Sequence, residues 1–246
     1  MISLQFFALS LSAKAELLKG RIVHSESLPP LDKGLAPGTT FDAKATSLGP
    51  PSKIVFFQIP AWLAGSWQVN SNTQTSSYDY KTRKQEITPK TFAAKYVDQF
   101  GSAVDGKGRY WQLEDTPKMM RADQGQYIAY YLLKENYPLE MSDRRMITRA
   151  VSIDIKVDKA TQRIASVKSV ERLQTYTLPV DNTMAVSASV KEFDIKGTAL
   201  SFGTVTTQER KITPFKTAGT EKMRKLLDKY LLEEGELPSS QQERKL

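Results

Sequence analysis

The sequence predicts a mainly β protein, folded as an antiparallel sandwich or barrel, with an extended N-terminal arm and a C-terminal α-helix. Three observations carry this prediction. Strand-like runs follow one another at short spacing between residues 53 and 213. No run of helical periodicity interrupts them. One stretch with helical spacing then follows, over residues 219–235.

Residues 1–15 allow two interpretations. An apolar run, Ile2 to Leu11, precedes Ala13-Lys14-Ala15, which has the small-x-small form of a signal-peptidase site. No basic residue precedes Lys14, so the alternative is an N-terminal amphipathic helix that docks on the rest of the protein. The run is shorter than the ~20 apolar residues of a membrane span, so we expect no transmembrane helix.

Residues 16–52 are expected to form an extended, proline-rich arm. Five of the 12 prolines lie between residues 25 and 52, and proline both lacks an amide proton and disfavours a helix before it. An arm that buried nothing would not offset the entropy lost on ordering it. We therefore expect Leu28, Leu31 and Leu35 to contact the main domain.

The main domain is expected over residues 53–213, as one continuous antiparallel β structure. Its clearest strand is 151–157, in which Val151, Ile153, Ile155 and Val157 alternate with polar residues and should share one buried face. The other expected strands cover 53–59, 65–80, 126–133, 163–170, 171–178, 184–195 and 198–213, with turns at 158–162 and Lys196-Gly197.

The C-terminal helix has one apolar stripe, and Gly235 is a natural stop. Residues 236–246 are expected to form a flexible tail. The residues of the stripe are Met223, Leu226, Leu227, Tyr230 and Leu231.

Composition excludes several kinds of chemistry. The chain has no cysteine and one histidine, His24, which removes cysteine-based metal sites, disulfides and any site that needs two imidazoles. We expect no metal and no cofactor. The net charge of +8 is spread along the chain without a basic block, so nucleic acid is not an expected partner.

Catalysis has little support in the sequence. There is no Gly-x-Ser-x-Gly nucleophile elbow, and a Ser–His–Asp arrangement would have to recruit His24 from the arm. The glycine-rich stretch 101–110 lacks the Gly-Lys-Ser/Thr ending of a phosphate loop and is expected to be a flexible loop. Arg144-Arg145 would suit an anionic group, although a neutralised turn is favoured. We expect a protein that is not an enzyme.

The densest local signal is Pro60-Ala-Trp62-Leu63-Ala-Gly65-Ser-Trp67, a Gly-x-Trp that opens a long strand. This motif, with the strands and helix after it, resembles the calycin group, which includes the lipocalins. The resemblance implies a single up-and-down β-barrel in which Gly65 permits a tight passage into the first strand. It implies that Trp67 closes one end, beneath a basic side chain of the last strand. Arg210 is the expected cation, and Lys211 is the alternative because strand register is not fixed by sequence.

The Pro-x-Trp-Leu-x-Gly-x-Trp start also resembles an uncharacterised family of exported cyanobacterial and plastid proteins. That resemblance implies export, to a periplasm or a thylakoid lumen. A soluble intracellular protein is the alternative. The long arm departs from the lipocalin pattern.

Three functions remain open. The first is a lipocalin-like binding protein for a small apolar or amphipathic ligand, lined by some of Trp67, Val69, Tyr78, Tyr127 and Tyr131. The same tyrosines would suit a wet outer sheet face equally well. The second is a structural or assembly factor that docks on a protein complex through its arm and C-terminal helix. The third is a barrel enzyme acting on an apolar substrate.

Overall fold

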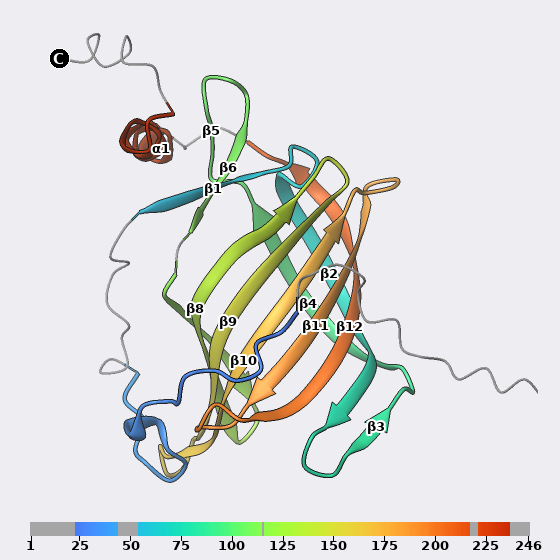
Figure 1. The fold of residues 1–246 in the computed structure, drawn as a ribbon, viewed down its shortest axis with the longest axis vertical. Coiled ribbons are helices and arrows are strands. Elements are labelled where there is room, and N and C mark those ends of the chain that lie inside the picture. Colours follow the sequence, from blue (N-terminus) through green and yellow to red (C-terminus); the bar gives the residue numbers. More distant parts are fainter. Residues whose placement is uncertain (1–22, 44–53, 115, 217–220, 237–246) are drawn as a thin grey trace, which may run out of the picture.

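The computed structural model describes residues 23–43, 54–114, 116–216 and 221–236. Over these ranges the chain is mainly β, with an α-helix near its C-terminal end (Figure 1). The segment 1–15, expected as a signal peptide or a helix, lies outside them. Residues 16–22 and 44–52 of the expected arm, residue 53 and most of the expected tail also lie outside them. No helix in the described ranges is long and apolar enough to cross a membrane.

The main sheet is antiparallel throughout and has nine strands among the described residues. Its strands are β2 (Gly65–Asp79), β3 (Lys84–Glu86), β4 (Lys90–Phe100), β7 (Lys118–Gln124), β8 (Tyr127–Met141), β9 (Arg145–Asp158), β10 (Ile164–Thr177), β11 (Thr183–Phe193) and β12 (Ala199–Pro214).

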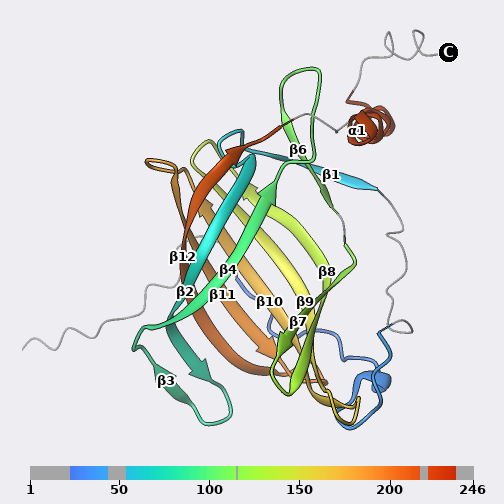
Figure 2. The same cartoon turned by 180° about the vertical axis from the view of Figure 1, so that it is seen from behind.

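The sheet is an up-and-down meander that curls on itself. Strands β7 to β12 are neighbours in chain order, β12 then pairs with β2, and β2 pairs with both β3 and β4. Figure 2 shows the curl from behind, with β4 and β7 at the two edges. No pairing joins β4 to β7 among the described residues, so the sheet is a curled half-barrel and not the closed barrel that was expected.

A second, three-stranded sheet lies at one end of the curl. It consists of β1 (Val55–Ile59), β5 (Ala103–Val104) and β6 (Tyr110–Glu114), in the order β1-β6-β5. The expectation of one continuous β structure over 53–213 is therefore wrong. The glycine-rich stretch 101–110 forms the β5–β6 hairpin, in which the Asp105 carboxylate accepts hydrogen bonds from the main chain of Lys107 and Arg109 and from Trp111 Nε1.

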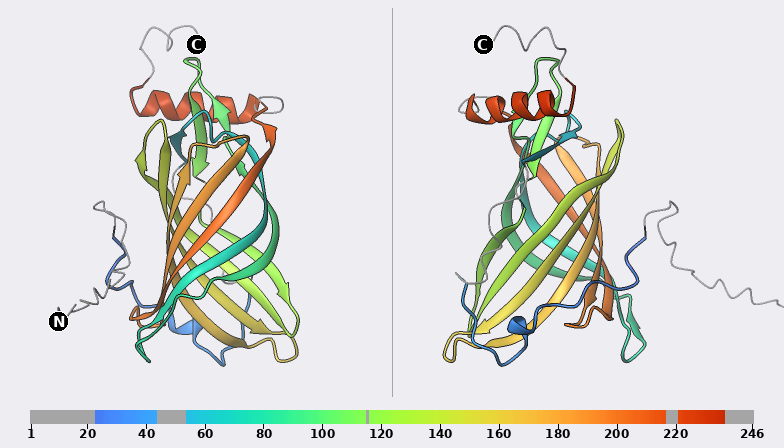
Figure 3. Two further views of the ribbon diagram at one scale, coloured as in Figure 1. Left: turned by 90° about the vertical axis from the view of Figure 1, so that its right-hand side faces the viewer. Right: turned by 60° about the vertical axis from the view of Figure 1, so that its left-hand side comes forward.

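The helix α1 (Glu221–Glu233) covers this small sheet, as Figure 3 shows from two sides. Leu227 and Leu231 are fully buried against Phe56, Ala103 and Trp111. The expected apolar stripe is confirmed, since its other three members pack on the same cluster. Gly235 follows the helix with a φ of 73°, as a C-terminal stop requires.

Residues 23–43, called the N-terminal segment below, lie across part of the convex face of the main sheet (Figures 1 and 3). Val151, Ile153, Ile155 and Val157 lie together on this buried face, as predicted. Phe41 packs on three of them, together with Leu31 and Leu35, while Leu28 packs on Val151. The three leucine contacts are thus confirmed. The segment also contains a short 3-10 helix, η1 (Lys33–Leu35).

Backbone contacts hold the N-terminal segment at both of its ends. Leu28 donates to the carbonyl of Gly197 at 3.2 Å, and Phe41 donates to that of Gln162 at 3.0 Å. Gly197 has a φ of +83°, and a Cβ added to it would lie 1.7 Å from the Leu28 carbonyl oxygen. The turn after β11 therefore needs glycine for two reasons, its backbone conformation and the close approach of the segment.

Strand boundaries differ from expectation in several places. The strands expected at 126–133 and 151–157 are longer, since β8 and β9 both run on toward the turn that joins them. The two strands expected at 163–170 and 171–178 are a single strand, β10 (Ile164–Thr177). The strands β4 and β7 were missed by sequence reasoning, because they lie at the edges of the sheet and most of their residues are exposed, so neither shows an apolar alternation.

Candidate functional site

Trp67 plugs one end of the curled sheet. Its side chain is fully buried, and its indole Nε1 donates a hydrogen bond to the Leu63 carbonyl at 2.7 Å. The surrounding cluster comes from β2, β9, β10, β11 and the residues before β2, so it fills this end with packed apolar side chains. Its members are Ile59, Leu63, Ala64, Met146, Tyr176, Met184 and Val186, with Trp62 and Phe100 packed against it.

The cation over Trp67 is Lys211, not Arg210. The Nζ atom of Lys211 lies 5.0 Å from the centre of the indole and donates to the Trp62 carbonyl at 3.1 Å. Lys211 is opposite Trp67 in the β2–β12 pairing, whereas Arg210 is opposite Gln68 and points to the other face, where it is exposed. Side chains alternate along a strand, so a neighbour cannot substitute.

Gly65 permits the close packing at the start of β2. It has a φ of +130°, and an added Cβ would lie 2.5 Å from the Thr213 carbonyl oxygen and 2.9 Å from Cε of Lys211. Any side chain here would displace the last strand or the stacked lysine. The role expected for Gly65, a tight passage into the strand, has this physical basis.

Two carboxyl groups lie next to the plug on the concave face. In the register of the sheet, Glu209 of β12 is opposite Val69, and Asp98 of β4 is opposite Trp67 on the other side of β2. Glu209 is 1% exposed, and among the described residues its Oε2 atom is buried with no hydrogen-bond partner. Such a group is costly unless something pairs with it.

Burial changes the protonation of both carboxyls. Burial, followed by the charge of Asp98, raises the pKa of Glu209 to about 8. Burial also raises the pKa of Asp98, although Arg172 and Lys118 act in the opposite direction. At neutral pH Glu209 is therefore mainly protonated. It has both a proton to give and an oxygen that lacks a partner.

Beyond the plug, several side chains that face the concave side remain exposed. Met120 is opposite Tyr131 on β8, and Phe92 is opposite Asn72 on β2; their exposed fractions are 47% and 52%. Arg172 of β10 also faces this side and is exposed. Because large side chains that point inward still reach solvent, they do not fill this part of the curl.

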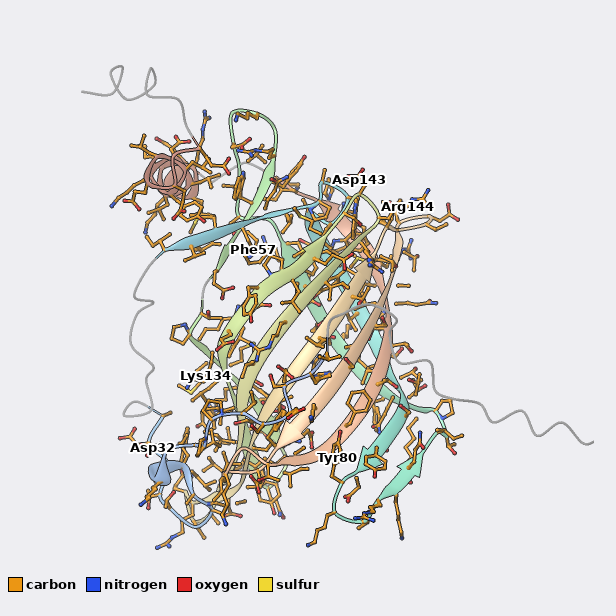
Figure 4. All side chains as sticks on the ribbon, viewed as in Figure 1. Asp32, Phe57, Tyr80, Lys134, Asp143 and Arg144 are labelled. Atoms are coloured by element: carbon orange, nitrogen blue, oxygen red, sulfur yellow. The ribbon has the colours of Figure 1, made fainter. Side chains whose placement is uncertain are left out.

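The five expected ligand-lining residues lie on both faces of the sheet. Trp67 and Val69 are buried on the concave side, and Tyr127 and Tyr131 also face it, opposite Asp158 and Asp154. Tyr78 is on the convex side. Its ring packs edge-on against that of Tyr80, with 5.0 Å between centroids, and Figure 4 places Tyr80 far from the Asp143–Arg144 turn that marks the plugged end. Tyr78 therefore lies on the other face of the sheet from the remaining four residues.

The single histidine joins a polar network on the convex face. Nδ1 of His24 lies 2.8 Å from Oε2 of Glu171, and its Nε2 lies 2.8 Å from Oγ of Ser189. Ser25 donates to both oxygens of Glu171, and Arg149 donates to Oε1 at 2.7 Å. Burial opposes ionisation of Glu171, but these hydrogen bonds outweigh it and hold the pKa at about 2.

Ser189, His24 and Glu171 contact one another in the same order as the residues of a hydrolase triad, but their surroundings differ from those of a triad. Ser189 is 6% exposed and lies inside β11, with neighbours on both sides in the sheet. Its backbone is part of the ladder and offers no donor for an oxyanion. Glu171 also accepts from three residues, not from the imidazole alone. We interpret the network as a clamp that fastens the N-terminal segment to the sheet.

A cavity of about 700 Å³ lies on the convex face, between the N-terminal segment and strands β8 to β10. Leu132, Val151 and Ile153 form part of its wall, and Lys134 and Asp32, labelled in Figure 4, lie at it too. It is on the opposite side of the sheet from Trp67 and Glu209. The described residues offer no group of three His, Asp or Glu side chains that would hold a metal ion.

Sequence reasoning missed the carboxyl pair and Arg172. One signal was present: along 205–211, Val205, Thr207, Glu209 and Lys211 share a face, which puts a glutamate on the same side as Lys211, the alternative cation over Trp67. Asp98 gave no such signal, because its strand was not recognised. The pairing of β4 with β2 depends on the tertiary structure, so no local pattern in the sequence predicts it.

The fold and this site define a class of protein: a curled antiparallel sheet, plugged at one end by a tryptophan, with a partly polar concave face. Comparison with known proteins adds no particular identity, since no family model, curated protein or solved structure matches the chain.

Proposed function

We propose that the protein is a lipocalin-like, non-catalytic binding protein that holds a small apolar or amphipathic ligand on the concave face of its sheet. The observation that carries the proposal is the exposure of large inward-facing side chains, Phe92 and Met120 among them, beyond a plugged end. A curled sheet of this size either fills with side chains or leaves room for one ligand. Tyr127 and Tyr131 are the proposed lining residues, whereas Val69 and Trp67 are fully buried at the plugged end.

The order of strands supports the same proposal. The meander β7–β12 returns to pair with β2, and β2 carries β4 at its other side. A pairing of β4 with β7 would close this sheet into an up-and-down barrel, so we propose the half-barrel as an opened form of that architecture. The N-terminal segment then serves as an arm that seals the convex face.

The alternative of an assembly factor needs apolar surface on the helix or the N-terminal segment. Leu227 and Leu231 of the helix are already buried against the small sheet. Leu28, Leu31 and Leu35 are used against the main sheet. The apolar faces of both elements are therefore buried within the chain. This favours the binding protein over the assembly factor.

We further propose that the protein is exported, on the strength of the apolar run and Ala13-Lys14-Ala15. N-terminal sequencing of protein from its own source tests this. A new terminus at or near Glu16 supports export, and a retained Met1 overturns it.

Native mass spectrometry of the full chain, purified from its own source, tests the binding proposal. A bound small molecule is expected. Its position is tested with two tryptophan variants: Ala150→Trp, at an inward-facing residue opposite Arg172, and Lys134→Trp, at the convex cavity. Loss of the ligand from the first variant alone supports the proposal. Loss from the second alone, or no adduct and no binding of alkyl probes, overturns it.

A further inference from the structure

The concave face carries a polar group, the Glu209 carboxyl, with which the apolar part of a ligand forms no hydrogen bond. Oε2 of Glu209 is buried without a partner among the described residues. Asp98, which is only partly buried, lies close enough for its charge to act on Glu209. Asp98 is therefore both near Glu209 and partly open to solvent.

The cations nearby do not serve Glu209. Lys211 is held over Trp67 and donates to the Trp62 carbonyl. Arg172 and Lys118 act on the charge of Asp98, whereas among the described residues only burial and the charge of Asp98 act on the ionisation of Glu209. A buried carboxylate without a counter-ion is unfavourable. A ligand group that brought both a hydrogen-bond donor and a positive charge would supply what Glu209 lacks.

The walls around the pair suit an organic cation. Tyr96 is opposite Val69, in the same row of the sheet as Glu209, and Tyr176 lies in the plug next to it. The charges of Asp98 and Glu209 both act on Tyr96 and Tyr176, so the four groups are close together. Aromatic rings with carboxylates are the usual surroundings of a bound ammonium group.

Resting on the proposed function, we infer that the ligand is an amphipathic amine, whose protonated nitrogen is bound between Glu209 and Asp98 and whose apolar part lies along the concave face. A neutral hydroxyl would supply the missing hydrogen bond but no charge. A carboxylate would add a negative charge beside the carboxyl groups of Asp98 and Glu209.

Three probes with the same alkyl tail test the inference on the full chain by isothermal titration calorimetry. They are decylamine and decanoate, each below its micelle concentration, and decanol below its solubility limit. We expect decylamine to bind at least about tenfold more tightly than the other two. Equal binding of all three overturns the amine inference while leaving the proposed function. Binding of none overturns the proposed function itself.

Matched variants locate the nitrogen. Glu209→Gln keeps the shape of the side chain and should weaken decylamine about tenfold or more while leaving decanol within about twofold. The control is Glu192→Gln, at an inward-facing glutamate that already pairs with Lys168 and Ser201; its decylamine affinity should equal that of the wild type. Thermal unfolding verifies that each variant is folded. A decylamine affinity that Glu209→Gln leaves unchanged overturns the inference.

Proton release on binding is a second measurement. It would not depend on Glu209 if that residue had only a structural role. Glu209 has a pKa of about 8 without ligand, so binding an ammonium group at pH 7 must ionise it and release a proton. The groups that share this space and also titrate or carry charge are Asp98, Tyr96, Tyr176, Arg172, Lys118 and Lys211. Titrations in buffers of different ionisation enthalpy should show release in the wild type and none in Glu209→Gln. Uptake of a proton, or equal release in both, contradicts the inference.

Discussion

Lys211 places its ammonium nitrogen 5.0 Å from the centre of the Trp67 indole, and the same nitrogen donates to the Trp62 carbonyl. One side chain of the last strand thus holds the first long strand and the loop that precedes it. Burial lowers the pKa of Lys211. The contact therefore carries a desolvation cost that the ring and the carbonyl together offset.

Trp67→Ala should be the most destabilising change at the plugged end. We expect a loss of roughly 3–5 kcal/mol from burial and cavity terms, against about 0.5–2 kcal/mol for Lys211→Ala. Arg210→Ala, at the exposed neighbour, is the control and should stay within about 0.5 kcal/mol of the wild type. Urea unfolding of the three variants measures this order. If Arg210→Ala proved as costly as Lys211→Ala, the assignment of the stacked cation would be wrong.

Gly197→Ala should destabilise the protein more than a positive φ alone explains. The added methyl group would collide with the Leu28 carbonyl at 1.7 Å, so the N-terminal segment must move. Gly125→Ala is the matched control: its φ is +68° and nothing lies within 4 Å of the added Cβ. The control should cost about 1–2 kcal/mol. Limited proteolysis within residues 23–43 should accelerate for Gly197→Ala only, and equal rates would argue against the close contact.

Glu171→Gln should loosen the N-terminal segment at neutral pH and cost about 1.5–3 kcal/mol. The pKa of Glu171 falls from a usual 4.5 to about 2 in the folded chain. Its contribution is therefore complete above about pH 4.5 and is lost as the pH falls through about 2. Unfolding free energies of wild type and variant should converge over that window. A difference that stays constant down to pH 2 would show that the carboxylate is not the stabilising group.

Glu209 should make the protein less stable as the pH rises from about 4.5 to about 8. Its pKa is raised on folding, so the unfolded chain releases this proton first. Against Glu209→Gln, the wild type should lose at most about 1.4 kcal/mol per pH unit over this window. Above about pH 8 the difference should level off. Parallel stability curves for the two proteins between pH 5 and pH 8 would contradict the raised pKa.

Local pattern predicted those parts of the fold that depend on neighbours in the chain. The alternation over 151–157 specified a strand with one apolar face, and the stripe of α1 specified a helix that must be covered, because side-chain direction follows from backbone periodicity. The same pattern said nothing of what would cover either face. Asp98 shows the limit most clearly: its exposed edge strand has no alternation, so half of the candidate site left no mark in the sequence.

The sequence by itself determined that Arg210 and Lys211 point to opposite faces, since adjacent residues of a regular strand do so. Only the tertiary structure decided which of them meets Trp67. That choice depends on the register of β12 against β2. Bulges at three places along this pair shift the register. The tertiary structure also decided that the apolar face of 151–157 is convex and lies under the N-terminal segment. The polar residues that alternate with these apolar ones lie on the concave side, with Glu209 and Asp98. Curvature belongs to the whole sheet, and no single strand encodes it.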